Sequence, residues 1–463
     1  MLGKGALIYV IGFGIVLATI GRTLNQYALD SIDNVVSYHD QAESHTMAIT
    51  GANVGMSKVY QDSTWFGTYG QPIKDASGAQ TGNVKISRFV VASDTSGTTS
   101  KLQAISAFCP WYAISANDTI RDTVEVTLRT GVLMPYSTMA WMTNDEGNVW
   151  WMSQDTVFGR VHSNSALNMD GTPTFYGRVT TAASMNPMPG KTSGGHTNKG
   201  VFKGGYETGV PAIPLPQDLS ALTDYAQNPL KYPGYKGNWY GNKDLWVTLD
   251  PGSTSVDGDG KALVWQTSSG GSASGKPDTV QLGNSQWVLA TSGTVHVQGT
   301  LDGKLTLVAG GSGADIKIEN DVKYQQNPFV NIKPDNPVDG YTGNDFLGLV
   351  ANDDIIVRDN SANDNGCTIM GALLAVNGSF TAENYDHGSP RNDLTVVGSI
   401  TQNTRGAVGT FSGGVVQTGY AKQYYYDTRF DNPSNTPPGF PGFNLGMVIS
   451  DWWESYPQPK SFW

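Results

Sequence analysis

The sequence predicts an α+β protein in which one long N-terminal helix precedes a body built mainly of β-strands. Residues Gly5 to Gly21 carry no charge, and apolar side chains after Arg22 recur mostly at steps of three or four. Because this step is the period of one helical face, we expect a continuous helix over residues 2–60, roughly 90 Å long at 1.5 Å per residue. After residue 60, short alternating runs between Gly, Thr and Ser predict strands.

The uncharged stretch has seventeen residues, the lower limit of a membrane span of roughly 17–25. A cleavable secretory signal would end at a small-residue site, whereas here the helical pattern runs on. The amphipathic continuation favours a bundle of such helices, although a lone membrane anchor remains the alternative. We expect the bundle to bury small or apolar side chains of this helix, namely Ile8, Ile11, Gly12, Ile15, Leu24, Ile32 and Val35.

Composition limits the possible partners. The net charge of −11, from 40 acidic and 29 basic residues, argues against nucleic acid, which needs clustered Lys and Arg. The 56 glycines and 23 prolines indicate many turns and short strands. Two cysteines, Cys109 and Cys367, exclude a disulfide framework, and whether they pair or are separate buried thiols stays open.

Pattern changes divide the chain into four ranges: a helix over 1–60, a β-rich part over 61–285, stacked strands over 286–410 and an aromatic segment over 411–463. Residues 181–241 are proline-rich and are predicted to be a loop. In 286–410, short apolar strands end in Gly or Asn about every ten residues, which predicts a β-helix or solenoid, with a β-sandwich as the alternative. Aromatic residues of the last range are expected to pack on the body or on a neighbouring subunit, among them Tyr425, Trp452, Trp453 and Trp463.

No catalytic motif stands out, and we expect neither enzymatic activity nor a cofactor. Gly270 to Lys276 has phosphate-loop spacing, but Pro277 replaces the required hydroxyl. His162 is expected to be a structural histidine. Carboxylate pairs for glycoside cleavage stay open, because such pairs meet only in the folded chain.

Two acidic turn-like segments are weak candidates for calcium, which prefers oxygen ligands. Asp and Asn also favour turns for their own backbone hydrogen bonds, so a structural role is the alternative. The candidate ligands are Asp257, Asp259, Asp359 and Asp364.

Three stretches carry a family resemblance: Lys4-Gly5 with the apolar helix, the region from Val149 through VHSN to Gly177, and residues 394–441 with LTVVGSITQNTRGAVGTF and YAKQYYYDTRFDNPSNTPPGFP. Together they resemble an uncharacterised bacterial family of pilin-like surface proteins, related to the minor pilins of type IV pilus systems. The resemblance implies a membrane-inserted helix, an exported β-rich head and a role in pili or related surface filaments.

One position departs from that family pattern. Major type IV pilins are similar to one another in carrying a Glu five residues into the mature helix, where it neutralises a neighbour's amino terminus. Here Gly5 occupies that position, and the first acidic residue is Asp30. If Met1 is the mature start, assembly has to rest on apolar packing instead.

These observations predict the structural subunit of an extracellular, type IV pilus-like filament that polymerises through its N-terminal helix. Its expected partners are further copies of the chain, the inner membrane before assembly and the pilus assembly machinery, with no nucleic acid. A minor or tip subunit, or a membrane-anchored adhesin that binds through its β head, with residues 187–241 as the binding surface, is the first alternative. A surface-anchored hydrolase is the second.

Overall fold

The computed structural model describes residues 2–62, 64–74, 76–94, 97–110, 119–131, 133–253, 258–329, 336–412, 415–444 and 447–455. It has two compact units, Met1–Leu133 with Asn444–Trp463, and Met134–Phe443. We call the first the helix unit and the second the inserted unit, because the second interrupts the first in sequence. A long N-terminal helix followed by a large β-rich part confirms the predicted α+β class.

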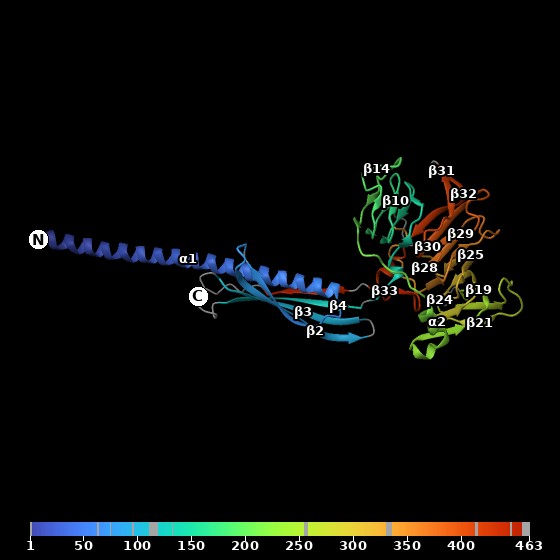
Figure 1. Cartoon of the computed structure of the whole chain (residues 1–463), viewed down its shortest axis with the longest axis horizontal. Helices are drawn as coiled ribbons and strands as arrows, with labels where there is room; N and C mark the ends of the chain where they lie inside the picture. The colour runs from blue at the N-terminus through green and yellow to red at the C-terminus, as the bar shows by residue number, and fades with distance from the viewer. Residues whose placement is uncertain are drawn as a thin grey trace. The chain divides into compact units, whose positions relative to one another are not determined.

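The helix unit consists of helix α1 (Leu2–Gln61) along one face of an antiparallel sheet (Figure 1). The sheet order is β1-β2-β3-β4-β34, with bounds Gly67–Lys74, Gln80–Asp94, Gly97–Phe108, Ile120–Thr130 and Met447–Glu454. The last strand pairs antiparallel with β4, so the C-terminal part of the chain completes a sheet that the N-terminal part begins. The helix unit is therefore continuous in space and discontinuous in sequence.

Small side chains hold α1 against this sheet. Buried positions recur at helical spacing from residue 40 onwards, at Asp40, Ser44, Ala48, Gly51, Ala52, Gly55 and Val59. A Cβ atom added at Gly51 would lie 2.2 Å from Val84 Cγ1. Glycine at this position is what allows the helix to approach the strand so closely.

The polar contacts of the same interface join three distant parts of the helix unit. The Ser44 hydroxyl lies 2.6 Å from the Ser106 hydroxyl. The two ring nitrogens of His45 lie 2.8 Å from Asp122 Oδ2 and 3.0 Å from Glu454 Oε2. This histidine therefore connects the helix to β4 and to the last strand.

The helix predicted over residues 1–60 has two parts that differ in burial. Among the apolar residues that recur at helical spacing after Arg22, Ala52 and Val59 are buried and Ile49 and Met56 are half-buried, whereas Ala42 is exposed. From Asp40 onwards one face of the helix is covered by its own sheet, so only the part before it can lie wholly among other chains. The seven residues predicted for the bundle all precede Asp40 and lie outside the part that the sheet covers.

In the inserted unit, parallel pairing joins strands in the order β18-β22-β24-β26-β28-β30-β6-β9-β12-β17. Their bounds are Tyr235–Trp239, Gln286–Thr291, Lys304–Ala309, Phe346–Ala351, Cys367–Ala375, Pro390–Thr404, Trp141–Asp145, Val161–Ser163, Val179–Thr181 and Tyr206–Thr208. A second row joins β19, β23, β25, β27 and β29, which span Asp244–Asp250, Val295–Leu301, Ile316–Tyr324, Ile355–Val357 and Phe380–Ala382.

Because strands of the two rows alternate along the chain, each coil contributes one strand to each row and stacks on the coil before it. The stacked strands predicted for residues 286–410 are present. They are part of a longer stack that takes in residues 141–208 and 235–250 as well, so the predicted boundaries at 285 and 410 do not coincide with the two units. Leu289, Leu307, Leu349 and Leu373 are fully buried in this stack.

Residues 141–208 form short, regular coils. β7 (Trp150–Trp151), β10 (Leu167–Met169) and β13 (Met185–Asn186) pair in parallel, as do β8 (Thr156–Val157), β11 (Thr174–Phe175) and β16 (Val201–Phe202). A Cβ atom at Gly177 would lie 2.2 Å from the Gly159 carbonyl oxygen, and one at Gly204 would lie 2.4 Å from the Gly177 carbonyl carbon. The coils stack this closely because glycine recurs at the same corner.

The remaining elements are connections and hairpins. The predicted loop over 181–241 instead contains several of them together with β16 and β17, because most of its prolines lie between short elements and Pro229 begins η3. The bounds are Leu133–Pro135 (β5), Tyr136–Thr138 (η2), Thr192–Ser193 (β14), His196–Thr197 (β15), Ser220–Gln227 (α2), Pro229–Lys231 (η3), Lys261–Thr267 (β20), Asp278–Gln281 (β21), Gly409–Ser412 (β31), Val415–Tyr425 (β32), Thr428–Asp431 (η4) and Gly442–Asn444 (β33).

The close approach at Gly51 gives a first prediction. Gly51→Val should destabilise the packing of α1 on its sheet by about 1–3 kcal/mol, because the new side chain overlaps Val84. Gly21→Val is the matched control, since a Cβ atom at Gly21 meets nothing within 4 Å. In hydrogen exchange of the full chain in detergent, amides of β2 and β3 should exchange about 5- to 150-fold faster in the first variant alone. Equal exchange in both variants would show that the interface tolerates the extra volume.

A buried carboxyl in the inserted unit gives a second prediction. Asp345 is 1% exposed, accepts a hydrogen bond from the Gly303 amide at 2.7 Å, and has its pKa raised by burial to about 6. Between about pH 4 and 6 the folded carboxyl keeps a proton that the unfolded chain releases, so stability falls as pH rises through this window. Asp345→Asn cannot release that proton, and its stability should not fall there.

The measurement is the thermal unfolding midpoint of both proteins at pH 4 and at pH 7.5. From pH 4 to pH 7.5, the free energy of unfolding of Asp345→Asn relative to that of the natural chain should rise by up to about 3 kcal/mol, at 1.36 kcal/mol per pKa unit. The exposed substitution Asp364→Asn is the control. Parallel pH profiles of natural chain and Asp345→Asn would mean that Asp345 titrates normally.

Candidate functional site

The first candidate site is the N-terminal part of α1. Every residue from Ile8 to Val36 is exposed, and we call this stretch the exposed helix segment. Its large apolar side chains are between 36% exposed, at Val36, and 83% exposed, at Tyr9. The helix has a mean hydropathy of 1.5 in its most apolar window, and it is long and apolar enough to cross a membrane. Because burying one large aliphatic side chain is worth about 1.5–3 kcal/mol, this surface requires lipid or protein cover.

Two threonine hydroxyls of this segment are compatible with apolar surroundings. The Thr19 hydroxyl donates to the Ile15 carbonyl at 2.8 Å, and the Thr23 hydroxyl donates to the Thr19 carbonyl at 2.9 Å. Both donors are satisfied within the helix, so burying them against a neighbour leaves no broken hydrogen bond. Further along, Gln26 Nε2 donates to Asp30 Oδ1 at 3.1 Å.

The seven residues predicted for the filament core all lie in the exposed helix segment. Ile8 is 71% exposed, Ile11 54% and Ile15 62%, and Leu24, Ile32 and Val35 are exposed to a similar extent. A Cβ atom at Gly12 would meet nothing within 4 Å. None of these side chains is needed to hold the chain's own fold together, and their role in a filament stays a prediction.

The aromatic residues of the predicted C-terminal segment separate between the two units. Trp452 in β34 packs partly buried against the core of the helix unit, and its Nε1 donates to Glu454 Oε1 at 2.6 Å. Trp453 is 52% exposed. Tyr425 belongs instead to the inserted unit, in β32, and Trp463 lies outside the described residues. Range 411–463 is therefore not one structural segment, because the return from the inserted unit to the sheet falls within it.

The acidic turns predicted as calcium ligands are largely occupied by the protein itself. Asp359 forms an ion pair with Arg391 Nη2 at 2.6 Å and accepts from Asn384 Nδ2 at 2.8 Å. Asp259 accepts from the Ser253 amide at 3.0 Å, Asp364 is exposed, and Asp257 lies outside the described residues. Within the described part of the chain, no group of three or more His, Cys, Asp or Glu side chains could hold a metal ion.

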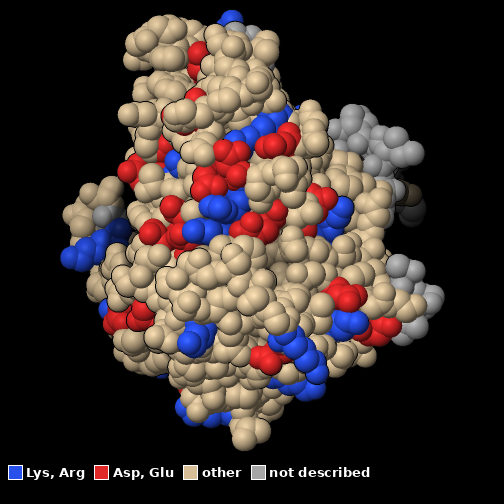
Figure 2. Space-filling model, turned by 90° about the vertical axis from the view of Figure 1, so that its right-hand side faces the viewer, with Lys and Arg blue, Asp and Glu red and all other residues tan. Residues whose placement is uncertain are grey.

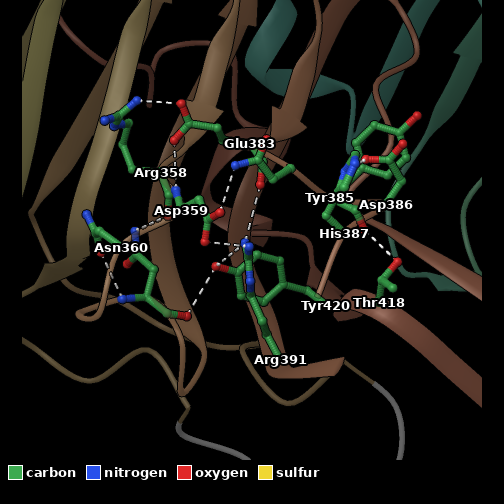
Figure 3. A network of polar contacts seen from close by, with 12 residues as sticks. Arg358, Asp359, Asn360, Glu383, Tyr385, Asp386, His387, Arg391, Thr418 and Tyr420 are labelled. Atoms are coloured by element: carbon green, nitrogen blue, oxygen red, sulfur yellow. Dashed lines mark hydrogen bonds and ion pairs between the residues drawn. The ribbon is translucent and has the colours of Figure 1, made fainter. Parts of the chain in front are cut away.

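Asp359 belongs to a network of polar contacts between neighbouring coils (Figure 3). Arg358 Nη1 pairs with Glu383 Oε1 at 2.6 Å, and the same carboxylate accepts from the Asp359 amide at 3.0 Å. Arg358 and Asp359 follow β27, whereas Glu383 follows β29. Over the face in Figure 2, Lys and Arg likewise lie beside Asp and Glu rather than forming a patch of one sign. The Arg358–Glu383 and Asp359–Arg391 ion pairs hold one coil to the next.

The structure also places His162 and the two cysteines, which the sequence singled out. His162 is buried, with its ring nitrogens 2.8 Å from Thr180 Oγ1 and 2.9 Å from Asn164 Oδ1. Burial lowers the pKa of this histidine. Cys109 is exposed and Cys367 is buried, and neither forms a disulfide.

The second candidate site is a cavity of about 870 Å³ in the inserted unit. Its walls come from the first coils, residues 141–176, and from the region after β30, residues 405–425, with Pro337. Aromatic rings and side-chain amides share the lining. The rings belong to Trp141, Trp150, Phe158, Tyr176, Phe411, Tyr424 and Tyr425, and the amides to Asn148, Gln154 and Gln423.

Charged groups in the cavity wall are paired. Lys422 Nζ lies 2.5 Å from Asp155 Oδ1, and burial lowers the pKa of this lysine while the Asp155 charge opposes the effect. Arg405 Nη1 lies 2.7 Å from Glu146 Oε2, behind the wall. Glu146 is fully buried and also accepts from Trp141 Nε1 at 3.3 Å and Trp151 Nε1 at 3.1 Å. These contacts fix the wall and leave it with balanced charge.

The aromatic lining is held by ring stacking between coils. Tyr176 and Phe158 stack with centroids 4.9 Å apart, Phe158 and Tyr425 stack at 5.9 Å, and Lys203 Nζ lies 3.7 Å from the Tyr176 centroid. Trp150 stacks on His196 at 3.7 Å, and His196 Nδ1 lies 3.2 Å from Asp170 Oδ2. Such stacks preorganise the rings before any ligand arrives.

Sequence reasoning missed this cavity, although a signal was present. The segment Val157-Phe158-Gly159-Arg160-Val161 is followed eighteen residues later by Phe175-Tyr176-Gly177-Arg178-Val179. This repeat marks equivalent corners of successive coils, and its second position supplies two of the stacked rings. The proline-rich range 187–241, which is the binding surface in the alternative of a minor or tip subunit, contributes no side chain to the described lining.

Comparison with known proteins adds one likeness. No protein-family model and no curated protein matches the sequence. Among solved structures, the chain is similar to the competence-associated pilin ComZ from Thermus thermophilus, at 14% identity and a TM-score of 0.32. The match covers 90% of this chain and 98% of that one.

Proposed function

We propose that the chain is the structural subunit of an extracellular, type IV pilus-like filament and that it polymerises through the exposed helix segment. One observation carries the proposal: α1 is exposed from Ile8 to Val36, uncharged up to Gly21 and still bearing large apolar side chains beyond Arg22, yet from Asp40 it is covered on one face by its own sheet. The uncharged part needs apolar cover all round, and the large apolar side chains beyond it need cover on their side of the helix. A central bundle of identical helices supplies that cover.

Length separates a bundle from a lone membrane anchor. Residues 8–36 span roughly 43 Å at 1.5 Å per residue, more than the hydrocarbon thickness of about 30 Å. Arg22 ends the uncharged stretch, but large apolar side chains continue beyond it, with Leu24 63%, Tyr27 68% and Ile32 59% exposed. When residues 5–21 occupy a bilayer, these side chains lie outside its core. They therefore need protein cover, which supports assembly.

Close packing between helices is also possible along the uncharged part. Lipid tails give no hydrophobic drive for helices to associate, so their association depends on close contact at small residues. Gly12 and Gly14 leave open space at their Cβ positions.

The proposal implies three partners: the inner membrane before assembly, further copies of the chain and the pilus assembly machinery. It assigns the chain no catalytic activity. Identical subunits joined head to tail without closure give a filament.

The test places a charge beyond the uncharged stretch. Ile32→Asp should abolish filaments while the protein stays in the membrane, because the new carboxylate lies at a helix–helix contact and outside the bilayer core. Asn25→Asp is the matched control, since it adds the same group at an already polar, exposed position of the same helix. Filaments are sheared from cells, weighed by mass spectrometry and viewed by negative-stain microscopy.

Normal filament yield from Ile32→Asp would refute assembly through this part of the helix, whereas the absence of filaments from the natural chain would leave a lone anchor. Loss of the variant from the membrane fraction would show that residue 32 acts in insertion instead. A third arm with Ile11→Asp, which lies inside the uncharged stretch, should also lose filaments, because a carboxylate there opposes both membrane insertion and apolar helix packing.

A minor or tip subunit that binds a partner is the second candidate. The observation that favours it is the size of the insertion, residues 134–443, together with its preorganised aromatic cavity. Copy number in purified filaments decides between the two. A major subunit makes up most of the protein in the filament, whereas a tip subunit is present at a few copies per filament.

A further inference from the structure

We infer that the cavity between the first coils and residues 405–425, which include β31 and β32, is a binding site for a neutral carbohydrate. The inference goes beyond filament formation and holds for a major or a minor subunit alike. It rests on four properties of the described lining: volume, balanced charge, the mixture of rings and amides, and rigidity.

Volume and rigidity make the cavity a binding site. At about 870 Å³ it lies within the range of about 300–1,000 Å³ that is usual for ligand sites. Its walls are strand ends and coil corners held by the Phe158 stack and by the buried Glu146–Arg405 pair. A preformed site of this kind loses little conformational freedom when a ligand binds.

Charge balance argues for a neutral ligand. Three charged side chains line the cavity, namely Asp155, Arg405 and Lys422. Lys422 is paired with Asp155, and Arg405 is paired with Glu146. An anionic or cationic ligand would have to displace one of these internal partners, and breaking a buried pair costs about 3–5 kcal/mol.

The remaining lining matches the two kinds of surface on a sugar ring. A pyranose presents a patch of C–H groups on its face and hydroxyls around its edge. Aromatic rings such as Trp150 and Tyr176 offer flat apolar surface to the C–H patch. Side-chain amides such as Gln154 and Gln423 both donate and accept hydrogen bonds, which is what a hydroxyl requires.

Trp150 is the ring best placed to show this binding. His196 covers one face of its indole and does not line the cavity, so the other face or an edge of the indole contributes to the lining. The strand β7 that carries Trp150 is paired in parallel to β10, which fixes the position of its backbone. Removing the indole therefore changes the cavity surface and leaves the coil pairing in place.

The same lining supports binding rather than cleavage. Glycoside hydrolysis uses two carboxyl groups flanking the bond that breaks. Among the described lining residues Asp155 is the single carboxylate, and Lys422 holds it in an ion pair. A bound glycan would remain intact.

The test uses the full chain in a zwitterionic detergent that carries no sugar. Isothermal titration with a panel of neutral hexose and N-acetylhexosamine trisaccharides, and with matched uronic acid trisaccharides, should show binding by at least one neutral member. Trp150→Ala and Gln423→Ala should each weaken that binding about tenfold or more, which corresponds to 1.4 kcal/mol. Trp287→Ala is the matched control, because Trp287 is a half-buried tryptophan of the same unit outside this lining.

Each variant is first compared with the natural chain by circular dichroism and by thermal midpoint, so that a misfolded variant is not counted. If Trp150→Ala misfolds, Trp150→Phe takes its place and should retain part of the affinity. Equal affinity in Trp150→Ala and the natural chain would overturn the assignment. So would binding of the uronic acid members alone, or no binding of any trisaccharide at millimolar concentration.

Discussion

The structure depends on a change in the surroundings of one helix near residue 40. Before it, every residue of α1 from Ile8 to Val36 is exposed, and large apolar side chains recur along this stretch. After it, Gly51 and neighbouring small residues bring one face of the helix into contact with β2 and β3. The second half anchors the helix to a folded unit, and the first half is left for lipid or for other chains.

The insertion of residues 134–443 follows from the way the sheet is completed. Because β34 has to pair with β4, the chain must leave the helix unit and return to it with a strand in register. Stacked coils suit this demand, since each coil contacts only its neighbours and coils can be added without rearranging the rest. Gly177 against Gly159 shows the constraint that stacking imposes, because any side chain there would meet backbone.

The cavity arises from the same stacking. β6 of the first coil pairs with β30, which lies more than two hundred residues later in the chain, and this pairing brings the tyrosines of β32 beside the rings of the first coils. Its polar groups are satisfied mainly by one another, as Lys422 is by Asp155. The wall is rigid and balanced in charge for that reason, and these are the features on which the carbohydrate proposal depends.

The sequence by itself determined the long helix, the α+β class and the stacked strands after residue 286, because hydrophobic periodicity is a local property. Tertiary structure decided which half of α1 is covered, since Ala42 and Ala52 look alike in the sequence and only the sheet distinguishes them. It also decided that Asp359 faces Arg391 across coils, and that Trp150 and Tyr425 line one cavity. Contacts between residues so far apart depend on which coil lies against which, for instance β6 against β30, and no local pattern specifies that pairing.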